Sequence, residues 1–99
     1  MIVRLHRDAD PELVDLDRLD RLHAETPAPL SDVRLSGWCR SADDEHVWLD
    51  VGRCRSIGAT AAGDAWGQRY DEMIADAAST GWTNEAGTAV RAHVEHIGS

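Results

Sequence analysis

The chain has 99 residues, of which 42% are hydrophobic and 28% charged, and this length predicts one domain over residues 1–99 with a single modest core. Eighteen acidic residues oppose ten arginines and no lysine, and the resulting net charge of −8 repels nucleic-acid phosphates and anionic lipid. We therefore expect neither a nucleic-acid partner nor a membrane surface. The arginine-only, alanine-rich composition is typical of a high-GC genome.

The two cysteines, Cys39 and Cys54, have no zinc or redox spacing, and two are too few for a disulfide framework. We interpret both as reduced thiols. The first residues do not resemble a signal peptide, and no apolar run approaches the length of a membrane span. The sequence therefore predicts a cytoplasmic protein.

The first two predicted elements are a strand and a helix. Residues 2–6 alternate apolar and polar side chains, which favours a short strand. A helix is predicted from Asp10, where Asp is a good N-cap and Pro11 suits the first helical position. Leucines recur every third residue from Leu13 to Leu22, and the prolines of residues 26–29 end the helix.

A hairpin is predicted over residues 33–54, with an acidic loop at 41–45. If Arg40 lies opposite His46, one face is apolar and contains Val33, Leu35, Gly37, Cys39, Val47, Leu49 and Val51. The other face is amphipathic and pairs two tryptophans across the strands. It is the predicted binding face, consisting of Arg34, Trp38, Arg40, His46, Trp48 and Asp50.

Two further helices are predicted after a flexible connection at 56–63. The first covers residues 64–81 with an apolar stripe from Trp66 to Ala77, and the second covers 83–97 with His93 in its apolar stripe. The predicted fold is therefore a two-layer α+β domain in the order β-α-β-β-α-α, with helices packed on one small mixed or antiparallel sheet.

Four groups of residues have side chains or spacings that can bind a metal, a phosphate or a nucleic acid, or carry out acid–base catalysis. His93 and His96 are three residues apart on a predicted helix and could share a metal with Glu25 or Asp76. The helix turns their side chains about 60° apart, and no HExxH motif or Cys/His cluster supplies a third and fourth ligand, so we expect no metal and no cofactor. Residues 58–63 have the glycine spacing of a phosphate loop but lack its Lys and Ser/Thr. His93 and Asp50 are weak candidates for acid–base catalysis, because no nucleophile motif accompanies them. A local basic strip of Arg34, Arg40, Arg53 and Arg55 is a third hypothesis, in which the protein associates with nucleic acid.

The aromatic hairpin face and the acidic charge favour a small protein-interaction module, acting as a homodimer or as the acidic partner of another protein, and not an enzyme. Whether that face is exposed or covered by a helix stays open at this point. The alternative is a small enzyme or ligand-binding domain with a pocket between the sheet and the last two helices, lined by His93, Tyr70, Trp48 and Asp50.

Overall fold

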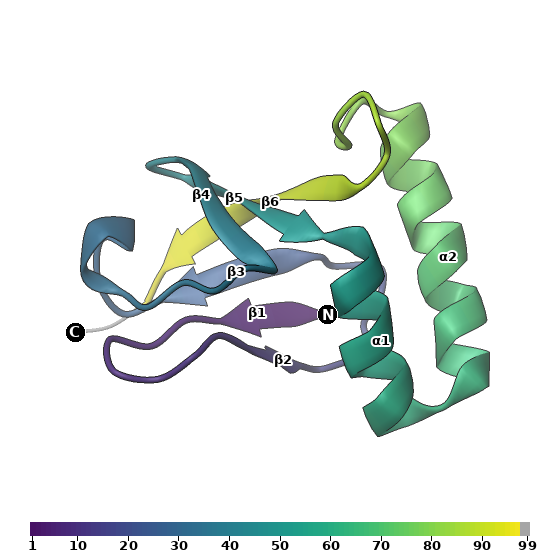
Figure 1. Cartoon of the computed structure of the whole chain (residues 1–99), viewed down its shortest axis with the longest axis horizontal. Helices are drawn as coiled ribbons and strands as arrows, with labels where there is room; N and C mark the ends of the chain where they lie inside the picture. Colours follow the sequence, from purple (N-terminus) through teal and green to yellow (C-terminus); the bar gives the residue numbers. More distant parts are fainter. Residues whose placement is uncertain (98–99) are drawn as a thin grey trace.

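A mixed six-stranded sheet and two α-helices form the fold, as seen in a computed structural model that describes residues 1–97 (Figure 1). The predicted α+β class is confirmed. The strands are β1 (Ile2–Arg4), β2 (Glu12–Val14), β3 (His23–Thr26), β4 (Cys39–Asp43), β5 (His46–Asp50) and β6 (Ala89–His96). The helices are the 3-10 helix η1 (Leu30–Asp32), α1 (Val51–Ala62) and α2 (Asp64–Ser79).

The strands follow the order β2-β1-β3-β6-β5-β4, so the last strand of the chain lies in the middle of the sheet. β3 pairs in parallel with both β1 and β6, whereas β1–β2, β5–β6 and β4–β5 are antiparallel. Because β6 alone joins β3 to β5, it connects the N-terminal strands to the β4–β5 hairpin.

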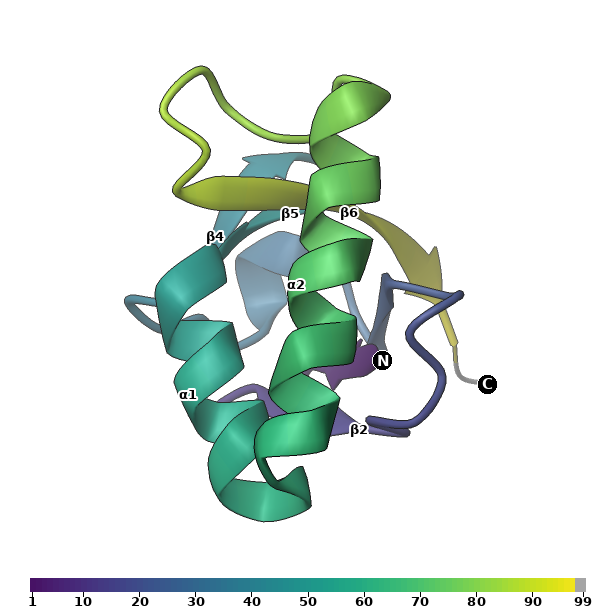
Figure 2. The same ribbon diagram turned by 90° about the vertical axis from the view of Figure 1, so that its right-hand side faces the viewer.

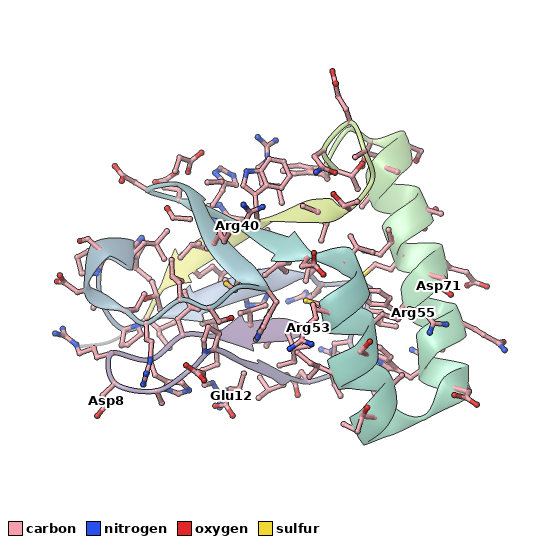
Figure 3. The ribbon with its side chains drawn as sticks, in the orientation of Figure 1. Asp8, Glu12, Arg40, Arg53, Arg55 and Asp71 are labelled. Carbon is pink, nitrogen blue, oxygen red and sulfur yellow. The ribbon has the colours of Figure 1, made fainter. Side chains whose placement is uncertain are left out.

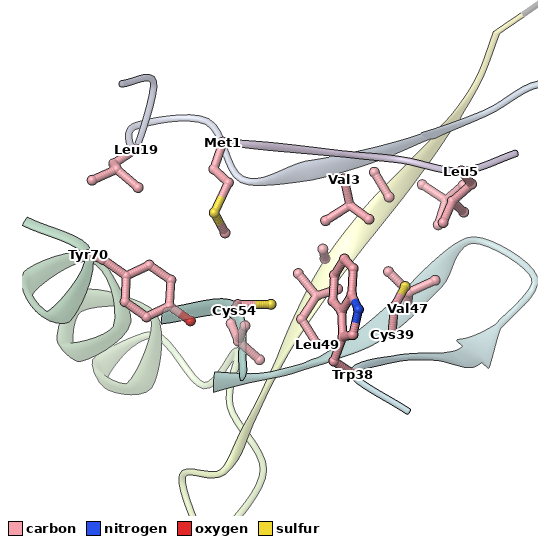
Figure 4. Close-up of a cluster of buried hydrophobic side chains, with 14 of the residues drawn as sticks. Met1, Val3, Leu5, Leu19, Trp38, Cys39, Val47, Leu49, Cys54 and Tyr70 are labelled. Atoms are coloured by element: carbon pink, nitrogen blue, oxygen red, sulfur yellow. The ribbon is translucent and has the colours of Figure 1, made fainter. Parts of the chain in front are cut away.

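The core lies on the inner face of the sheet. Met1, Val3 and Leu5 lie opposite Val47 and Leu49 across this core (Figure 4). Alternate residues of β6 complete the inner face, since Val90, Ala92 and Val94 are all buried. Trp38, on the segment before β4, also packs into this cluster.

The two helices lie side by side at one end of the sheet, while η1 lies at the opposite end (Figure 1). Figure 2, viewed from that side, shows α1 and α2 in front of the strands. The Tyr70 hydroxyl of α2 donates to the carbonyl of Val51, and Arg55 donates two hydrogen bonds of 2.8 and 3.0 Å to Asp71 (Figure 3). The predicted two-layer packing is not confirmed.

The helix predicted from Asp10 is wrong. This segment forms the edge strand β2, a series of turns and β3, and Asp15 has a positive φ of 50° that no α-helix contains. Leu13 pairs with Val3, and the Leu16 carbonyl accepts a 2.7 Å hydrogen bond from the indole N–H of Trp66. Leu19 therefore enters the core, and Leu13, Leu16 and Leu22 pack against it, from the strand β2 and the turns that follow.

The helix predicted over residues 83–97 is also wrong, because residues 89–96 form β6. From Val90 to Glu95, buried residues alternate with more exposed ones in the period of two that a strand requires. The predicted order β-α-β-β-α-α is consequently wrong, and the observed order of strands and α-helices is β-β-β-β-β-α-α-β.

The hairpin exists, but it is shorter than predicted and its register differs. Arg40 lies opposite Trp48, not His46, and the connection is confined to residues 44–45. A shift of two positions preserves the faces, so Cys39 shares the core face with Val47 and Leu49, as predicted. The predicted connection at 56–63 is mostly α1, whereas the helix over 64–81 is confirmed as α2.

Gly58 on α1 provides a test of how closely the two helices pack. A Cβ added to Gly58 would lie 2.1 Å from the Trp66 indole, whereas a Cβ at Gly52 would have only one neighbour, at 3.8 Å. We expect Gly58→Ala to lower the free energy of unfolding by about 1–3 kcal/mol through overpacking. Gly52→Ala on the same helix should leave stability unchanged or slightly higher. Urea unfolding measures both, and equal stabilities of the two variants would contradict this packing.

Candidate functional site

The outer face of the sheet, turned away from the core, places three histidines in a row. His23 of β3 lies beside His93 of β6, which in turn lies beside His46 of β5. We call these three residues the histidine row. The His46 and His93 rings meet edge to face with their centroids 5.5 Å apart.

Three of the six predicted binding residues lie together on this outer face. Arg40 projects from β4 (Figure 3), opposite Trp48, and His46 is two residues before Trp48 on the same side of β5. His46 lies beside Asp43, and Nδ1 of His46 is 2.9 Å from a carboxylate oxygen of Asp43. The backbone N–H of Glu45 and the ring of His46 stabilise the ionised form of Asp43 and lower its pKa.

The other three predicted binding residues lie elsewhere. Trp38 is buried in the core, so the predicted pairing of Trp38 with Trp48 is wrong. Arg34 is in a loop, where its guanidinium forms an exposed ion pair with Asp10. Asp50 caps α1, since its carboxylate accepts a 2.8 Å hydrogen bond from the backbone N–H of Arg53.

Next to the outer face lies an open groove of about 700 Å³, between α2, the β2–β3 loop and β6. Its apolar residues come from all three segments, and acidic residues lie among them. The lining residues are Leu19, Asp20, Leu22, Arg69, Glu72, Met73, Asp76, Ala77, Thr80, Trp82, Val90, Arg91 and His93.

This groove differs from the predicted pocket between the sheet and the last two helices, because the second of those helices is the strand β6, and three of the four predicted lining residues do not line the groove. His93 lines the groove, whereas Tyr70 is buried in the core and its hydroxyl is bonded to a backbone carbonyl. Burial raises the pKa of Tyr70. Trp48 lies on the outer face of β5 and Asp50 caps α1, so these four side chains do not converge.

His93 and Asp50 do not form the acid–base pair considered from the sequence, because Asp50 caps α1 and lies four residues along β5 from His46, the partner of His93. Within residues 1–97, the histidine side chains form hydrogen bonds with carboxylates and with no hydroxyl or thiol. The two cysteines are free and buried, and burial raises the pKa of each thiol to about 12. Neither thiol is therefore a candidate nucleophile.

The predicted arginine strip is not a continuous surface. Arg34 pairs with Asp10 and Arg55 pairs with Asp71, so the charges of these two arginines are compensated locally. Arg40 is on the outer face of the sheet, whereas Arg53 is on α1.

Among residues 1–97, neither α1 nor α2 combines the length and the hydropathy of a membrane-spanning helix.

The sequence singled out His93, His96 and Glu25 as possible ligands, but it did not point to His23 of β3 or Glu95 of β6. His23 lies 3.5 Å from Glu25 and 3.7 Å from Glu95, measured from its Nε2 to a carboxylate oxygen in each case. The signal in the sequence was the repetition of His-x-Glu at 23–25 and at 93–95.

Comparison of the chain with protein-family models, with curated proteins and with solved structures found no match.

The burial of the two thiols predicts their reactivity. At pH 8, Ellman's reagent should modify Cys39 and Cys54 of the native protein only as fast as the protein unfolds. Both thiols should react at once in 6 M guanidinium chloride. Immediate modification of either thiol in the native protein would contradict the buried positions.

The same thiols should make stability fall at alkaline pH. Their pKa is raised from 9.0 to about 12 in the folded chain, so above pH 9 the unfolded chain loses protons that the folded chain retains. The free energy of unfolding is therefore expected to decrease as pH rises from 8 to 10. Urea unfolding of a Cys39→Ala/Cys54→Ala variant should show a shallower decrease over this range, and an equally steep decrease would contradict the assignment.

Proposed function

We propose that this chain is a small protein-interaction module that binds a segment of a partner protein in the groove between α2 and β6, and that it is not an enzyme. The proposed segment carries apolar side chains next to Arg or Lys. The observation that supports this best is the composition of the groove, which combines apolar side chains with three acidic residues that are not engaged in ion pairs within residues 1–97.

The apolar part of the groove supports binding of a side chain from a partner. Trp82 is a large hydrophobic residue that is 42% exposed, and Met73 and Leu22 lie in the same groove. The guanidinium carbon of Arg91 lies 4.9 Å from the centre of a Trp82 ring, which restricts the indole. A restricted, exposed aromatic residue beside apolar neighbours is typical of an interface hot spot.

The charges of the groove favour a basic partner segment. Asp20, Glu72 and Asp76 supply three carboxylates, against the guanidinium groups of Arg69 and Arg91. Arg69 is engaged, since it donates a hydrogen bond to the Asp17 carbonyl, and Arg91 stacks on Trp82. The net charge of −8 would add long-range attraction for a basic partner.

A cytoplasmic location belongs to the same proposal. Cys39 and Cys54 are both free and buried, which is compatible with a reducing compartment.

Selection from a phage-displayed library of random 12-residue peptides tests the proposed binding. We expect enrichment of peptides in which Arg or Lys lies within a few residues of Trp, Leu or Met. A synthetic peptide from this set should bind at least about tenfold more weakly to a Glu72→Gln/Asp76→Asn variant, because two rim charges are lost.

An Asp44→Asn/Glu85→Gln variant is the matched control. It removes the same net charge from two exposed acids outside the groove, so it should bind the peptide as the original chain does. Equal weakening in both variants would reduce the effect to net charge and would overturn the proposal, as would failure to enrich any peptide. Native mass spectrometry tests a second occupant. If the original chain is a dimer and the Glu72→Gln/Asp76→Asn variant is a monomer, the groove instead binds a second copy of this chain, which is the homodimer that the sequence predicts.

A further inference from the structure

Two short sequence repeats lie side by side in the sheet. Residues 23–25 read His-Ala-Glu and residues 93–95 read His-Val-Glu, and both segments are in strands. The parallel pairing of β3 with β6 is in register, so His23 is beside His93 and Glu25 is beside Glu95. Since alternate residues of a strand share a face, all four side chains belong to the outer face of the sheet.

Three of these side chains converge on one point. The Nε2 atom of His23 lies 3.5 Å from an oxygen of Glu25 and 3.7 Å from an oxygen of Glu95. One ligand atom from each of the three residues lies within 4.8 Å of the other two. Nitrogen and oxygen ligands bind zinc at about 2.0–2.2 Å, so two ligands of one ion are at most about 4.4 Å apart. Small side-chain rotations would bring the three atoms to this separation.

The charges at this point favour a cation. Glu25 and Glu95 are directly opposite each other on neighbouring strands, where like charges destabilise a sheet. The Glu25 side chain is 20% exposed and the Glu95 side chain 56%, so solvent screens this repulsion only from the Glu95 side. Arg4 lies opposite Glu25 on its other side, but it forms no ion pair with Glu25 in the described part of the chain.

We propose that His23, Glu25 and Glu95 bind one divalent transition-metal ion, with Zn²⁺ as the test ion. One imidazole and two carboxylates form a borderline ligand set that suits zinc better than the oxygen-only sites of calcium or magnesium. Three protein ligands also leave a coordination position for water or for a group of a bound partner.

This site departs from the expectation of no metal, which relied on a helix at residues 93–96. On a helix, His93 and Glu95 would point in different directions, whereas on β6 they lie on the same face. The ligands His23 and Glu25 come from a strand about 70 positions earlier in the chain. The predicted fold placed these two residues at the end of the helix that begins at Asp10.

Calorimetric titration of chelator-treated protein with Zn²⁺ tests the site, together with native mass spectrometry to count bound ions. We expect one Zn²⁺ per chain and a rise in melting temperature on binding. Glu95→Gln should weaken binding at least about tenfold, because loss of even an outer-shell partner of a metal ligand costs about 10–100-fold in affinity. His23→Gln should abolish binding.

The chain contains a matched control at a second histidine–glutamate pair. Glu12 lies 2.9 Å from His6, and its side chain is 51% exposed, against 56% for Glu95. Glu12→Gln removes the same charge beside a histidine, and it should retain the Zn²⁺ affinity within about twofold, since that pair offers only two ligands. Absence of saturable binding, or equal loss of affinity in Glu12→Gln and Glu95→Gln, would overturn the proposal.

Discussion

The central position of β6 is the constraint on which the rest of the structure depends. β6 pairs with β3 on one side and with β5 on the other, and among the strands of residues 1–97 it alone joins the N-terminal strands to the β4–β5 hairpin. Its pairing with β3 closes a loop of about 70 residues, which is entropically costly and cannot be stabilised by local interactions. Burial of Val90, Ala92 and Val94 against the core offsets this cost. The core therefore assembles as a single unit only when β6 is paired between β3 and β5.

Elements whose signals are local could be predicted from the sequence. The apolar stripe of α2, the alternation of β1 and the two faces of the β4–β5 hairpin all depend on neighbouring residues, and all are present. The segment from Asp10 to Thr26 could not be predicted in this way, because its leucines contact partners far away in sequence, such as Trp66 and Val3. In β6, alternation was visible from Val90 onward, but the alanines and the preceding Thr and Asn also suited a helix.

The residues of the candidate site divide in the same way, into those whose positions depend on neighbouring residues and those whose positions depend on distant strands. Arg40, His46 and Trp48 were placed on one face correctly, because a two-position shift of register leaves the residues within the paired strands on their original faces. Trp38 precedes β4 and is buried in the core instead. The association of His23 and Glu25 with Glu95 depends on the parallel register of two distant strands, and no local pattern contains that information. The His-x-Glu repeat was the one signal available, and it acquires meaning only once both copies are known to be strands.

The alternation of β6 explains how so small a chain can build a core and two candidate binding sites from one strand. Its inward residues pack in the core, while Arg91 and His93 line the groove and Glu95 completes the cluster with His23 and Glu25. A one-residue slip of register would expose the apolar set and bury Arg91, His93 and Glu95. The same burial that holds β6 in the sheet therefore also fixes its outward residues against His23 on β3, His46 on β5 and Trp82 after α2. The positions of the candidate sites are in this sense a consequence of hydrophobic burial, and they require no separate interaction to specify them.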